Sequence, residues 1–353
     1  MSTRADRLAE LLSERELDCL LVSDLTNVRY LTGFTGTNGA AVVSADERLF
    51  LTDFRYVERA AAEVREFERL PAGRELLKDL APRLSGRAGF DDEHLSVRAH
   101  RRLADALSEG VELVPAGGLV ERLREVKDEA EVTAMAEAAK LGDSIYEYLV
   151  ERGLVGRTER EVAVDLEREM RLRGARDPSF PSIVAAGANG ALPHAEPRDV
   201  EIPRDTLVVL DLGCVVDSMC SDCTRTVATG EPSSEALEVY ELVRRAQAAA
   251  LEAARVGIPC RDVDAAARSL IEGAGHGERF GHGLGHGVGL EVHEGPRLTK
   301  TAEGELRAGN AVTIEPGVYV PGEVGVRIED LVIVGEDGLR NLSGFPKALV
   351  TVG

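Results

Sequence analysis

The sequence predicts an α+β protein with two domains, a smaller N-terminal α/β domain and a larger C-terminal domain of helices beside a sheet. At 353 residues the chain is long for one domain, and a content of 44% hydrophobic and 29% charged residues is typical of a globular protein. Short apolar runs alternate with helical patterns in roughly the first third, whereas the remainder combines long helical stretches with β-type runs. We therefore assign residues 1–122 to the first domain and 123–353 to the second, with the boundary just after the turn-forming segment PAGG.

The elements of the N-terminal domain follow from local patterns. Residues 4–18 have helical periodicity, and the apolar run in DCLLVSD predicts a short buried strand. The segment GAAVVSADERLFLTD at 39–53 predicts a hairpin, because a polar turn at 45–48 separates two apolar runs. Two further helices are expected, at 57–66 and 98–108.

The C-terminal domain is expected to have helices beside an antiparallel sheet. Helical patterns cover 127–151, 158–173 and 234–254, and the second begins with Thr158 followed by Glu161, which is the spacing of a capping box. Short β-type runs lie around these helices: DTLVVLDLG, SDCTRTVATG, AVTIEPGVYV and EDLVIVG.

Composition excludes several classes of partner. The net charge of −20, from 42 Lys and Arg against 62 Asp and Glu, would repel a phosphate backbone, so nucleic acid is not an expected partner. The chain has neither a membrane-spanning apolar run nor a signal-peptide core, so we expect a cytoplasmic protein that does not bind membranes. Five cysteines without a secretory signal argue against a disulfide framework, and we interpret the CxxC at 220–223 as inert.

Four acidic residues in β-type surroundings indicate a metal centre. Asp211 and Asp222 are eleven residues apart, and Glu315 and Glu329 are fourteen apart, so each pair fits adjacent strands of a hairpin. Two such hairpins can converge on one pocket, where a like-charge pair about 4 Å apart would cost on the order of 4 kcal/mol at an effective dielectric constant of about 20. Two divalent cations would cancel the four negative charges of these carboxylates, and a histidine would complete the ligand shell.

Any one of these acids, taken alone, could instead be a surface residue or pair with Arg225 or Arg327. The four together favour the metal centre because a histidine cluster accompanies them. Four of the seven histidines fall between residues 276 and 293, in and just before the glycine-rich stretch GHGLGHGVGLEVHEGP. The glycines there would let the backbone approach a metal ion closely.

These motifs, in this order and spacing, resemble the pita-bread metallopeptidases, in the branch of prolidase and aminopeptidase P. The resemblance rests on the acidic pair that ends in SDCTRT, on HGLGHGVGLEVHEGP, TIEPGVY and GVRIED, and on SFPSIVAAGANGALPHAEP. NVRYLTGFTG at 27–36 is similar to the creatinase-type N-terminal domain of that branch. The resemblance covers nearly the whole chain and implies a C-terminal pita-bread fold preceded by a smaller creatinase-like α/β domain.

The resemblance implies two divalent ions and five metal ligands. Carried over residue by residue, the ligands are Asp211, Asp222, His286, Glu315 and Glu329. Asp222 and Glu329 would bridge the two ions. Asp211 would bind one ion only, and His286 with Glu315 would bind the other. Such a hard, oxygen-rich shell suits Mn²⁺, with Co²⁺ or Zn²⁺ as alternatives.

The resemblance also implies catalytic roles. Glu315 is expected to take the proton of the attacking water, and His293 to touch the scissile carbonyl or to shuttle a proton. His194, in LPHAEP, matches a histidine that closes over the substrate. The implied reaction is hydrolysis of the bond before proline, in Xaa-Pro dipeptides or at the N-terminus of Xaa-Pro peptides.

The remaining candidates are substrate contacts. Phe180, Phe280 and His282 are expected near the proline ring, although both phenylalanines are equally compatible with the core. Arg297 matches a residue that holds the carboxylate of a dipeptide, and Arg327 faces the site in relatives. Proline-containing peptides are the expected partners, and a homodimer is the expected assembly.

Other functions stay open at this point. A methionine aminopeptidase shares the ligand set and the seven-residue step from His286 to His293, but it normally lacks the creatinase-type domain and His282. A non-catalytic pita-bread protein that binds peptides or partner proteins would normally have lost metal ligands, whereas all five are present here. A two-metal phosphatase or nuclease has no support, because no phosphate-cradling glycine loop follows a strand.

Overall fold

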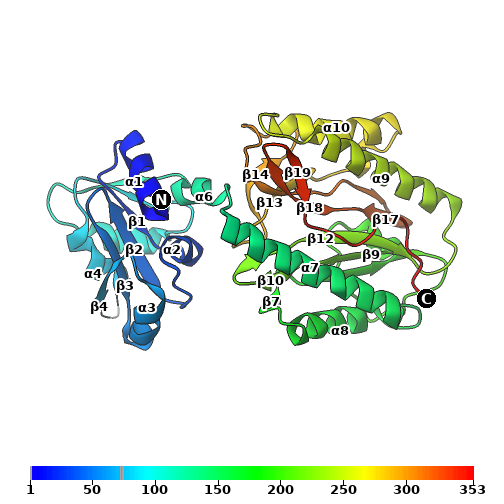
Figure 1. Ribbon diagram of the computed structural model, residues 1–353, viewed down its shortest axis with the longest axis horizontal. Coiled ribbons are helices and arrows are strands. Elements are labelled where there is room, and N and C mark those ends of the chain that lie inside the picture. The colour runs from blue at the N-terminus through cyan, green and yellow to red at the C-terminus, as the bar shows by residue number, and fades with distance from the viewer. Residues whose placement is uncertain (1, 72, 74) are drawn as a thin grey trace. The chain divides into compact units, whose positions relative to one another are not determined.

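The computed structural model in Figure 1 describes residues 2–71, 73 and 75–353. The chain divides into two compact units, Met1–Arg124 and Glu125–Gly353. The first unit is a mixed α/β structure, and the second combines helices with antiparallel sheets. No helix within the described residues is long and apolar enough to cross a membrane.

The N-terminal unit is built on one sheet. Its strands are β1 (Cys19–Val22), β2 (Gly39–Ser44), β3 (Arg48–Thr52), β4 (Glu68–Pro71), β5 (Arg87–Phe90) and β6 (Glu112–Pro115). They lie in the order β4-β3-β2-β1-β5-β6. The predicted strand in DCLLVSD is β1, and the predicted hairpin is confirmed because β2 and β3 pair antiparallel across the polar turn.

Helices pack around this sheet. They are α1 (Arg4–Glu14), α2 (Leu25–Thr32), α3 (Val57–Glu63), α4 (Leu76–Leu80), α5 (Val97–Ala104) and α6 (Leu119–Arg124), with 3-10 turns η1 (Phe54–Tyr56) and η2 (Ala81–Arg83). Thr3 and Asp6 form a capping box at the start of α1. The helix predicted over 4–18 ends earlier, at Glu14, because Glu16 has a φ of 54°, in the left-handed region. Both other predicted helices are present, as α3 and α5.

The C-terminal unit is rich in short strands. They are β7 (Asp177–Pro178), β8 (Ile183–Ala186), β9 (Leu207–Leu212), β10 (Cys214–Val216), β11 (Met219–Cys220), β12 (Cys223–Ala228), β13 (Gly285–Gly287), β14 (Glu294–Leu298), β15 (Ala311–Ile314), β16 (Gly317–Val320), β17 (Val324–Arg327), β18 (Asp330–Gly335) and β19 (Gly338–Asn341). They form sheets in the orders β12-β9-β8, β14-β13-β15-β18-β19, β11-β10-β7 and β16-β17. The predicted β-type runs correspond to β9, β12, β15 with β16, and β18.

Long helices cover these sheets on two sides (Figure 1). They are α7 (Glu129–Arg152), α8 (Glu159–Leu172), α9 (Ser234–Ala253) and α10 (Cys260–Gly273), with 3-10 turns η3 (Gly187–Ala191) and η4 (Gly277–Arg279). The first three confirm the predicted helices, and Thr158 forms the predicted capping box with Glu161. The prediction lacks α10, although its buried small and apolar positions have helical spacing: Cys260, Val263, Ala267 and Ile271.

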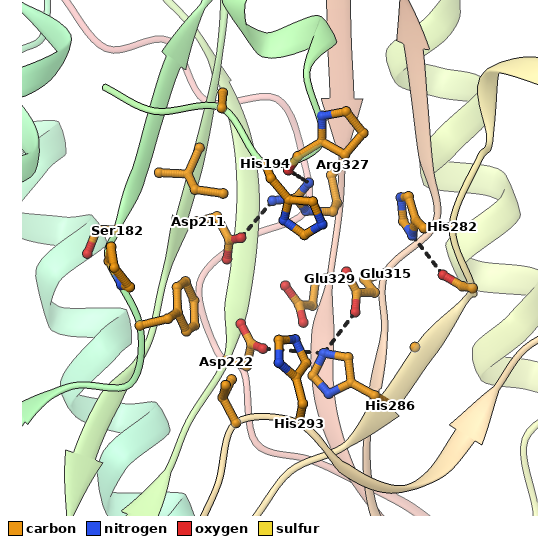
Figure 2. Close-up of a pocket in the computed structure, with 18 of the residues that line it drawn as sticks. Ser182, His194, Asp211, Asp222, His282, His286, His293, Glu315, Arg327 and Glu329 are labelled. Carbon is orange, nitrogen blue, oxygen red and sulfur yellow. Dashed lines mark hydrogen bonds and ion pairs between the residues drawn. The ribbon is translucent and has the colours of Figure 1, made fainter. Parts of the chain in front are cut away.

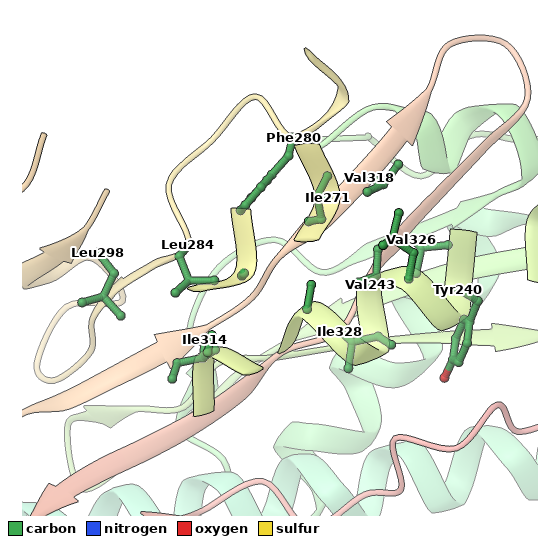
Figure 3. Packing of buried hydrophobic residues seen from close by; sticks show 14 of the residues in the cluster. Tyr240, Val243, Ile271, Phe280, Leu284, Leu298, Ile314, Val318, Val326 and Ile328 are labelled. Atoms are coloured by element: carbon green, nitrogen blue, oxygen red, sulfur yellow. The ribbon is translucent and has the colours of Figure 1, made fainter. Parts of the chain in front are cut away.

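Strand alternation directs polar side chains away from the helices. On β9, Leu210 and Leu212 pack in one hydrophobic cluster with α7 and α8, so the intervening Asp211 points to the opposite face. On β15, Val312 and Ile314 pack beneath α9 and α10 (Figure 3). Both faces of these strands are buried, as expected for strands covered on two sides.

Truncation of Ile271 on α10 is expected to destabilise the protein, whereas truncation of its neighbour is not. The side chain of Ile271 on α10 is fully buried in the hydrophobic cluster that α10 forms with α9 and the sheet. Ile271→Ala should therefore lower the free energy of unfolding by about 2–5 kcal/mol. Leu270 is 43% exposed, and Leu270→Ala removes the same number of carbon atoms as Ile271→Ala. It should change the free energy of unfolding by less than about 1 kcal/mol. Urea unfolding followed by circular dichroism measures both. Equal losses would contradict the packing described here.

Candidate active site

The candidate residues converge on one cavity of about 450 Å³ in the C-terminal unit. Figure 2 shows carboxylates and imidazoles from several strands and loops around it. The lining includes each predicted ligand, catalyst or substrate contact except Phe280, namely Phe180, His194, Asp211, Asp222, His282, His286, His293, Arg297, Glu315, Arg327 and Glu329. Segments far apart in the sequence therefore form one site.

Three carboxylates form the centre of the cavity. One oxygen from each of Asp211, Asp222 and Glu329 lies within 4.8 Å of the others, and all three residues are buried. Ionised carboxylates so close together repel one another strongly in a dry interior unless a cation lies between them. Burial and the neighbouring acids raise the pKa of Asp222 and of Glu329 well above the ordinary values, which expresses this repulsion.

Strand register brings the acids together. β9 and β12 pair antiparallel with Asp211 opposite Thr224, and Asp222 lies just before β12. β15 and β18 pair antiparallel at the end where Glu315 leaves one strand and Glu329 leads into the other. The predicted strand pairings are thus confirmed. Each connection also contains a smaller strand pair, β10–β11 in the first and β16–β17 in the second.

The centre has the donor set of a divalent metal site. Asp211 Oδ1 and Glu329 Oε1 are buried without a hydrogen-bond partner among the residues that the structure describes. The other oxygen of each is held, because Asp211 Oδ2 accepts from Arg327 Nη2 at 2.6 Å and Glu329 Oε2 accepts from Thr224 Oγ1 at 2.7 Å. Buried polar atoms without partners are rare in proteins, and carboxylate oxygens are the ligands that hard divalent cations prefer. Divalent metal ions therefore fit this site.

His286 lies beside the three carboxylates. Its Nε2 is 3.6 Å from Asp222 Oδ2 and 3.2 Å from Glu315 Oε1. Its Nδ1 is 2.9 Å from the carbonyl oxygen of Gly287, which can only accept, so Nδ1 donates and Nε2 is the atom directed at the acids. Burial acts to raise the pKa of Glu315, but His286, His282 and Arg327 together outweigh burial and lower this pKa below the ordinary value.

The glycines beside His286 serve close strand packing. A Cβ atom at Gly285 would lie 2.0 Å from the carbonyl oxygen of Thr313, and one at Gly287 would lie 1.9 Å from that of Gly295. No side chain fits at such distances. The sequence predicted that these glycines let the backbone approach a metal ion. The structure shows instead that they let neighbouring strands approach each other closely.

Arg327 is bound into the wall of the site. Its Nη2 donates to Asp211 Oδ2 at 2.6 Å, and its Nε donates to Thr224 Oγ1 at 2.9 Å. Its Nη1 donates to the Tyr319 hydroxyl at 2.9 Å and to the Pro193 carbonyl at 3.0 Å. These contacts use four of the five N–H groups and orient Asp211. The alternative that one of the acids pairs with Arg327 holds for Asp211, and the expected contact of Arg327 with substrate stays a prediction.

Tyr319 connects Arg327 to His282. The Tyr319 hydroxyl accepts from Arg327 and lies 2.9 Å from His282 Nε2. His282 Nδ1 lies 2.7 Å from the carbonyl oxygen of Gly283 and donates to it, so Nε2 accepts the tyrosine O–H. Burial lowers the pKa of His282, in agreement with a neutral ring.

His194, His293 and Arg297 lie at the exposed rim of the cavity. The ring centre of His293 is 4.4 Å from that of His286. Burial and the neighbouring His286 lower the pKa of His293, so this ring is neutral at neutral pH and can donate a hydrogen bond. The side chain of Arg297 has no hydrogen-bond or ion-pair partner within residues 2–71, 73 and 75–353.

The two phenylalanine candidates differ in position. Phe180 is half-buried and lines the cavity. Phe280 is 2% exposed and belongs to the hydrophobic cluster of α9 and α10 (Figure 3), so the core alternative is correct for this residue. Its ring packs edge-on behind His282, with 5.1 Å between ring centres.

A buried ion pair between Arg225 and Asp330 lies behind Glu329. Arg225 is 1% exposed, and Nη2 donates to Asp330 Oδ1 at 2.9 Å and to the Phe345 carbonyl at 2.8 Å. Its Nε donates to the same carbonyl at 3.0 Å, and Nη1 donates to the carbonyls of Thr224 and Glu329. All five N–H groups are used, and the side chain ties β12 to β18. The predicted alternative partner for an acid thus binds Asp330 instead.

Some site residues were not found from the sequence. Thr224, which holds Glu329, lies two residues after Asp222, so strand alternation alone predicts that both face the site. Tyr319 lies on β16, in the same strand pair as Arg327 of β17, but no local signal joins it to His282, which lies in a loop 37 residues earlier.

Comparison with known proteins agrees with this geometry. The model of metallopeptidase family M24 matches residues 133–336, and the model of the creatinase/prolidase N-terminal domain matches residues 4–126. The chain belongs to metallopeptidase family M24. This M24 peptidase thus has the predicted architecture, a creatinase-like domain followed by a pita-bread catalytic domain, and its family is metal-dependent.

The M24 peptidase is similar over its whole length to several relatives. An uncharacterised peptidase of Bacillus subtilis, YqhT, is 39% identical over 98% of this chain and 99% of its own. The solved structure of an Xaa-Pro dipeptidase from Bacillus anthracis is 36% identical, with a TM-score of 0.96 and coverage of 99% of both chains. That of an X-Pro aminopeptidase from Thermotoga maritima is 34% identical, with a TM-score of 0.88 over 96% of this chain and 99% of the other.

Asp222→Asn is expected to abolish stabilisation by Mn²⁺ without weakening the metal-free protein. The change removes one of three mutually repelling buried carboxylates and also one candidate ligand. At a Mn²⁺ concentration roughly 100 times the Kd, the wild-type protein should gain about 2.7 kcal/mol, and the variant less than about 0.5 kcal/mol. Thermal unfolding of chelator-treated protein with and without Mn²⁺ measures this gain. Asp199→Asn, at an exposed residue paired with Arg160, is the control and should respond like wild type. An undiminished gain in Asp222→Asn would contradict the assignment.

Proposed function

We propose that the protein is a dinuclear-metal peptidase that hydrolyses the bond before proline, in Xaa-Pro dipeptides or at the N-terminus of Xaa-Pro peptides. The observation that carries the proposal is the convergence of Asp211, Asp222 and Glu329 on one cavity, with His286 and Glu315 beside them. Similarity to an Xaa-Pro dipeptidase and an X-Pro aminopeptidase along the whole chain supports the choice of substrate. A homodimer and a cytoplasmic location stay predictions of the sequence.

The ligand set supports a pair of divalent ions, with Mn²⁺ as the first candidate. Asp211, Asp222, Glu315 and Glu329 would carry four negative charges, and His286 offers Nε2 because its Nδ1 donates to a carbonyl. Two divalent ions would balance that charge, and a shell dominated by carboxylates suits Mn²⁺, with Co²⁺ and Zn²⁺ as the alternatives to test. Bound there, such ions would activate a water molecule and polarise the scissile carbonyl.

The chain's own residues have separate tasks in this proposal. Glu315, half-buried at the edge of the carboxylate centre, would accept the proton of the attacking water on its carboxylate and return it to the departing proline nitrogen. His293, a neutral ring beside His286, would donate to the oxyanion that forms at the scissile carbonyl. His194, at the exposed rim, would close over the bound peptide.

A second group of residues would select the substrate. Proline forms a tertiary amide without an N–H group, so recognition depends on the shape of the ring rather than on a hydrogen bond from the backbone. Phe180 and His282 line the cavity and would enclose that ring. Arg297 is an unpaired cation at the rim and would hold the carboxylate of a dipeptide, whereas Arg327 would contribute mainly through Asp211.

Two alternatives define the comparison experiment. A methionine aminopeptidase would cleave after an N-terminal methionine, but the matched creatinase/prolidase domain and His282 favour the prolyl enzymes. A non-catalytic peptide-binding protein is disfavoured because the whole ligand set lines one cavity.

The test is direct. Chelator-treated protein is supplied with Mn²⁺, Co²⁺ or Zn²⁺ and incubated with Ala-Pro, Ala-Pro-Ala-Ala and Met-Ala-Ala, with products followed by mass spectrometry. We expect Mn²⁺-dependent cleavage before proline and no release of methionine. Cleavage of Met-Ala-Ala alone would support the methionine aminopeptidase, and absence of cleavage with every ion would overturn the catalytic proposal.

Arg297→Met is expected to weaken dipeptide binding through the lost contact with the substrate carboxylate. Hydrogen bonds to charged groups contribute about 1.5–3 kcal/mol, so the KM for Ala-Pro should rise about 10- to 100-fold. The KM for Ala-Pro amide, which lacks the carboxylate, should change less than about threefold, because the contact is absent from that substrate. Lys300→Met, at a nearby exposed cation paired with Glu272, is the control. Equal effects of Arg297→Met on both substrates would remove Arg297 from carboxylate recognition.

A further inference from the structure

The loop from Phe280 to Leu284 carries His282 into the cavity, yet it has no regular secondary structure. Such a loop needs other partners for its backbone polar groups if its side chain is to hold one position. Those partners come from α10, which lies behind the loop and contributes no residue to the lining of the cavity.

We propose that Arg268 and Asp264 of α10 are positioning residues that fix His282 in the substrate cavity and so determine how well the enzyme accepts Xaa-Pro substrates. The choice of Xaa-Pro peptides as substrates rests on the proposed function. The contacts of Arg268 and Asp264 with the loop do not depend on that function. Neither residue touches the cavity, so both act through the loop.

One turn of α10 holds three alternate residues of the loop. Arg268 Nη1 donates to the Phe280 carbonyl at 2.9 Å, and Nη2 donates to the His282 carbonyl at 2.7 Å. Asp264 Oδ1 accepts from the backbone N–H of Leu284 at 3.1 Å. The two side chains are joined to each other by a bidentate pair, with Nε to Oδ2 at 2.7 Å and Nη2 to Oδ1 at 2.8 Å. The planar guanidinium therefore connects the helix to the loop in a fixed geometry.

Ring contacts also connect Arg268 to the imidazole of His282. The Arg268 guanidinium carbon lies 3.9 Å from the centre of the Phe280 ring, and that ring meets the His282 ring edge-on at 5.1 Å. On its far side, His282 accepts from the Tyr319 hydroxyl at Nε2. The imidazole is thus held between α10 and β16, and a shift of the loop would move it directly.

Burial argues that the pair serves position more than stability. The side chain of Arg268 is 5% exposed and that of Asp264 is fully buried. The desolvation of such a pair cancels much of its Coulomb attraction, so the ion pair by itself adds little to the stability of the fold. Apolar residues cannot donate to the two loop carbonyls, and this directional restraint is what the ion pair adds.

The test is a double-mutant cycle on the Mn²⁺-loaded full-length enzyme with Ala-Pro as substrate. Arg268→Lys keeps a cation beside Asp264 but cannot reach both carbonyls. It should lower kcat/KM about 10- to 100-fold, because a small displacement of a positioned group can cost that much. In the His282→Gln background the same change should cost less than about threefold, because its effect passes through His282. The Mn²⁺ affinity, measured by calorimetry, should stay within about twofold of wild type in Arg268→Lys, both alone and combined with His282→Gln.

A second readout does not depend on catalysis. Metal-free protein labelled with ¹³C-histidine is compared by NMR, with the His282 signal assigned from His282→Gln. Arg268→Lys should shift that signal and leave the His286 signal in place. Arg261→Lys, on the same helix at an exposed arginine beside Asp262, should leave both signals and the activity unchanged.

Each outcome decides the inference. Independent, multiplying effects of Arg268→Lys and His282→Gln, or an unmoved His282 signal, would overturn it. Asp264→Asn, which keeps an acceptor for the Leu284 N–H, is the second variant if Arg268→Lys does not fold, and failure of both to fold would assign the pair a purely structural role. If wild type cleaves no Xaa-Pro substrate, the proposed function fails, while the NMR comparison still decides whether Arg268 positions His282.

Discussion

Mutual repulsion among Asp211, Asp222 and Glu329 is the constraint around which the C-terminal unit is organised. Three carboxylates within 4.8 Å of one another would separate, or take up protons, unless rigid elements held them in place. The β9–β12 and β15–β18 pairings do so, and the other faces of these sheets are anchored in the cores beneath the helices. Bound cations would turn this unfavourable cluster of charge into a ligand shell.

Three buried arginines hold parts of the site in place, and each donates both to an acidic side chain and to at least one backbone carbonyl. Arg327 orients Asp211, Arg225 ties together the strands behind Glu329, and Arg268 holds the loop of His282. Burying an arginine is costly and gives little net stability even when it is paired with an acid. A planar group with five donors is nevertheless well suited to fixing several chain segments at once. The polar interior of this unit is therefore best understood as a scaffold for geometry rather than as a source of stability.

Helix signals in the sequence were reliable where periodicity was long and a cap was present. α7, α8 and α9 were predictable from such patterns, and the Thr158 capping box marks the start of α8 as expected. Short or small-residue elements were less accessible. α10 lacks a side-chain cap, and its buried face includes the charged Asp264 and Arg268 beside four apolar residues, so its apolar stripe is weak in the sequence. The early end of α1 depends on the left-handed backbone at Glu16, a residue type that gives no warning of it.

The sequence by itself determined the chemistry of the site: which oxygen and nitrogen donors are available, and that the acids occur in pairs at spacings suited to neighbouring strands. Those features are local, since side-chain type and strand alternation are properties of a few consecutive residues. Only the tertiary structure decided which oxygens of Asp211 and Glu329 lack partners, that the donors of Arg327 are directed at Asp211, and that Phe280 supports His282 from the core. The first two outcomes depend on the register and packing of segments about a hundred residues apart, for example Thr224 against Glu329, and no short stretch of sequence encodes how two distant strands meet.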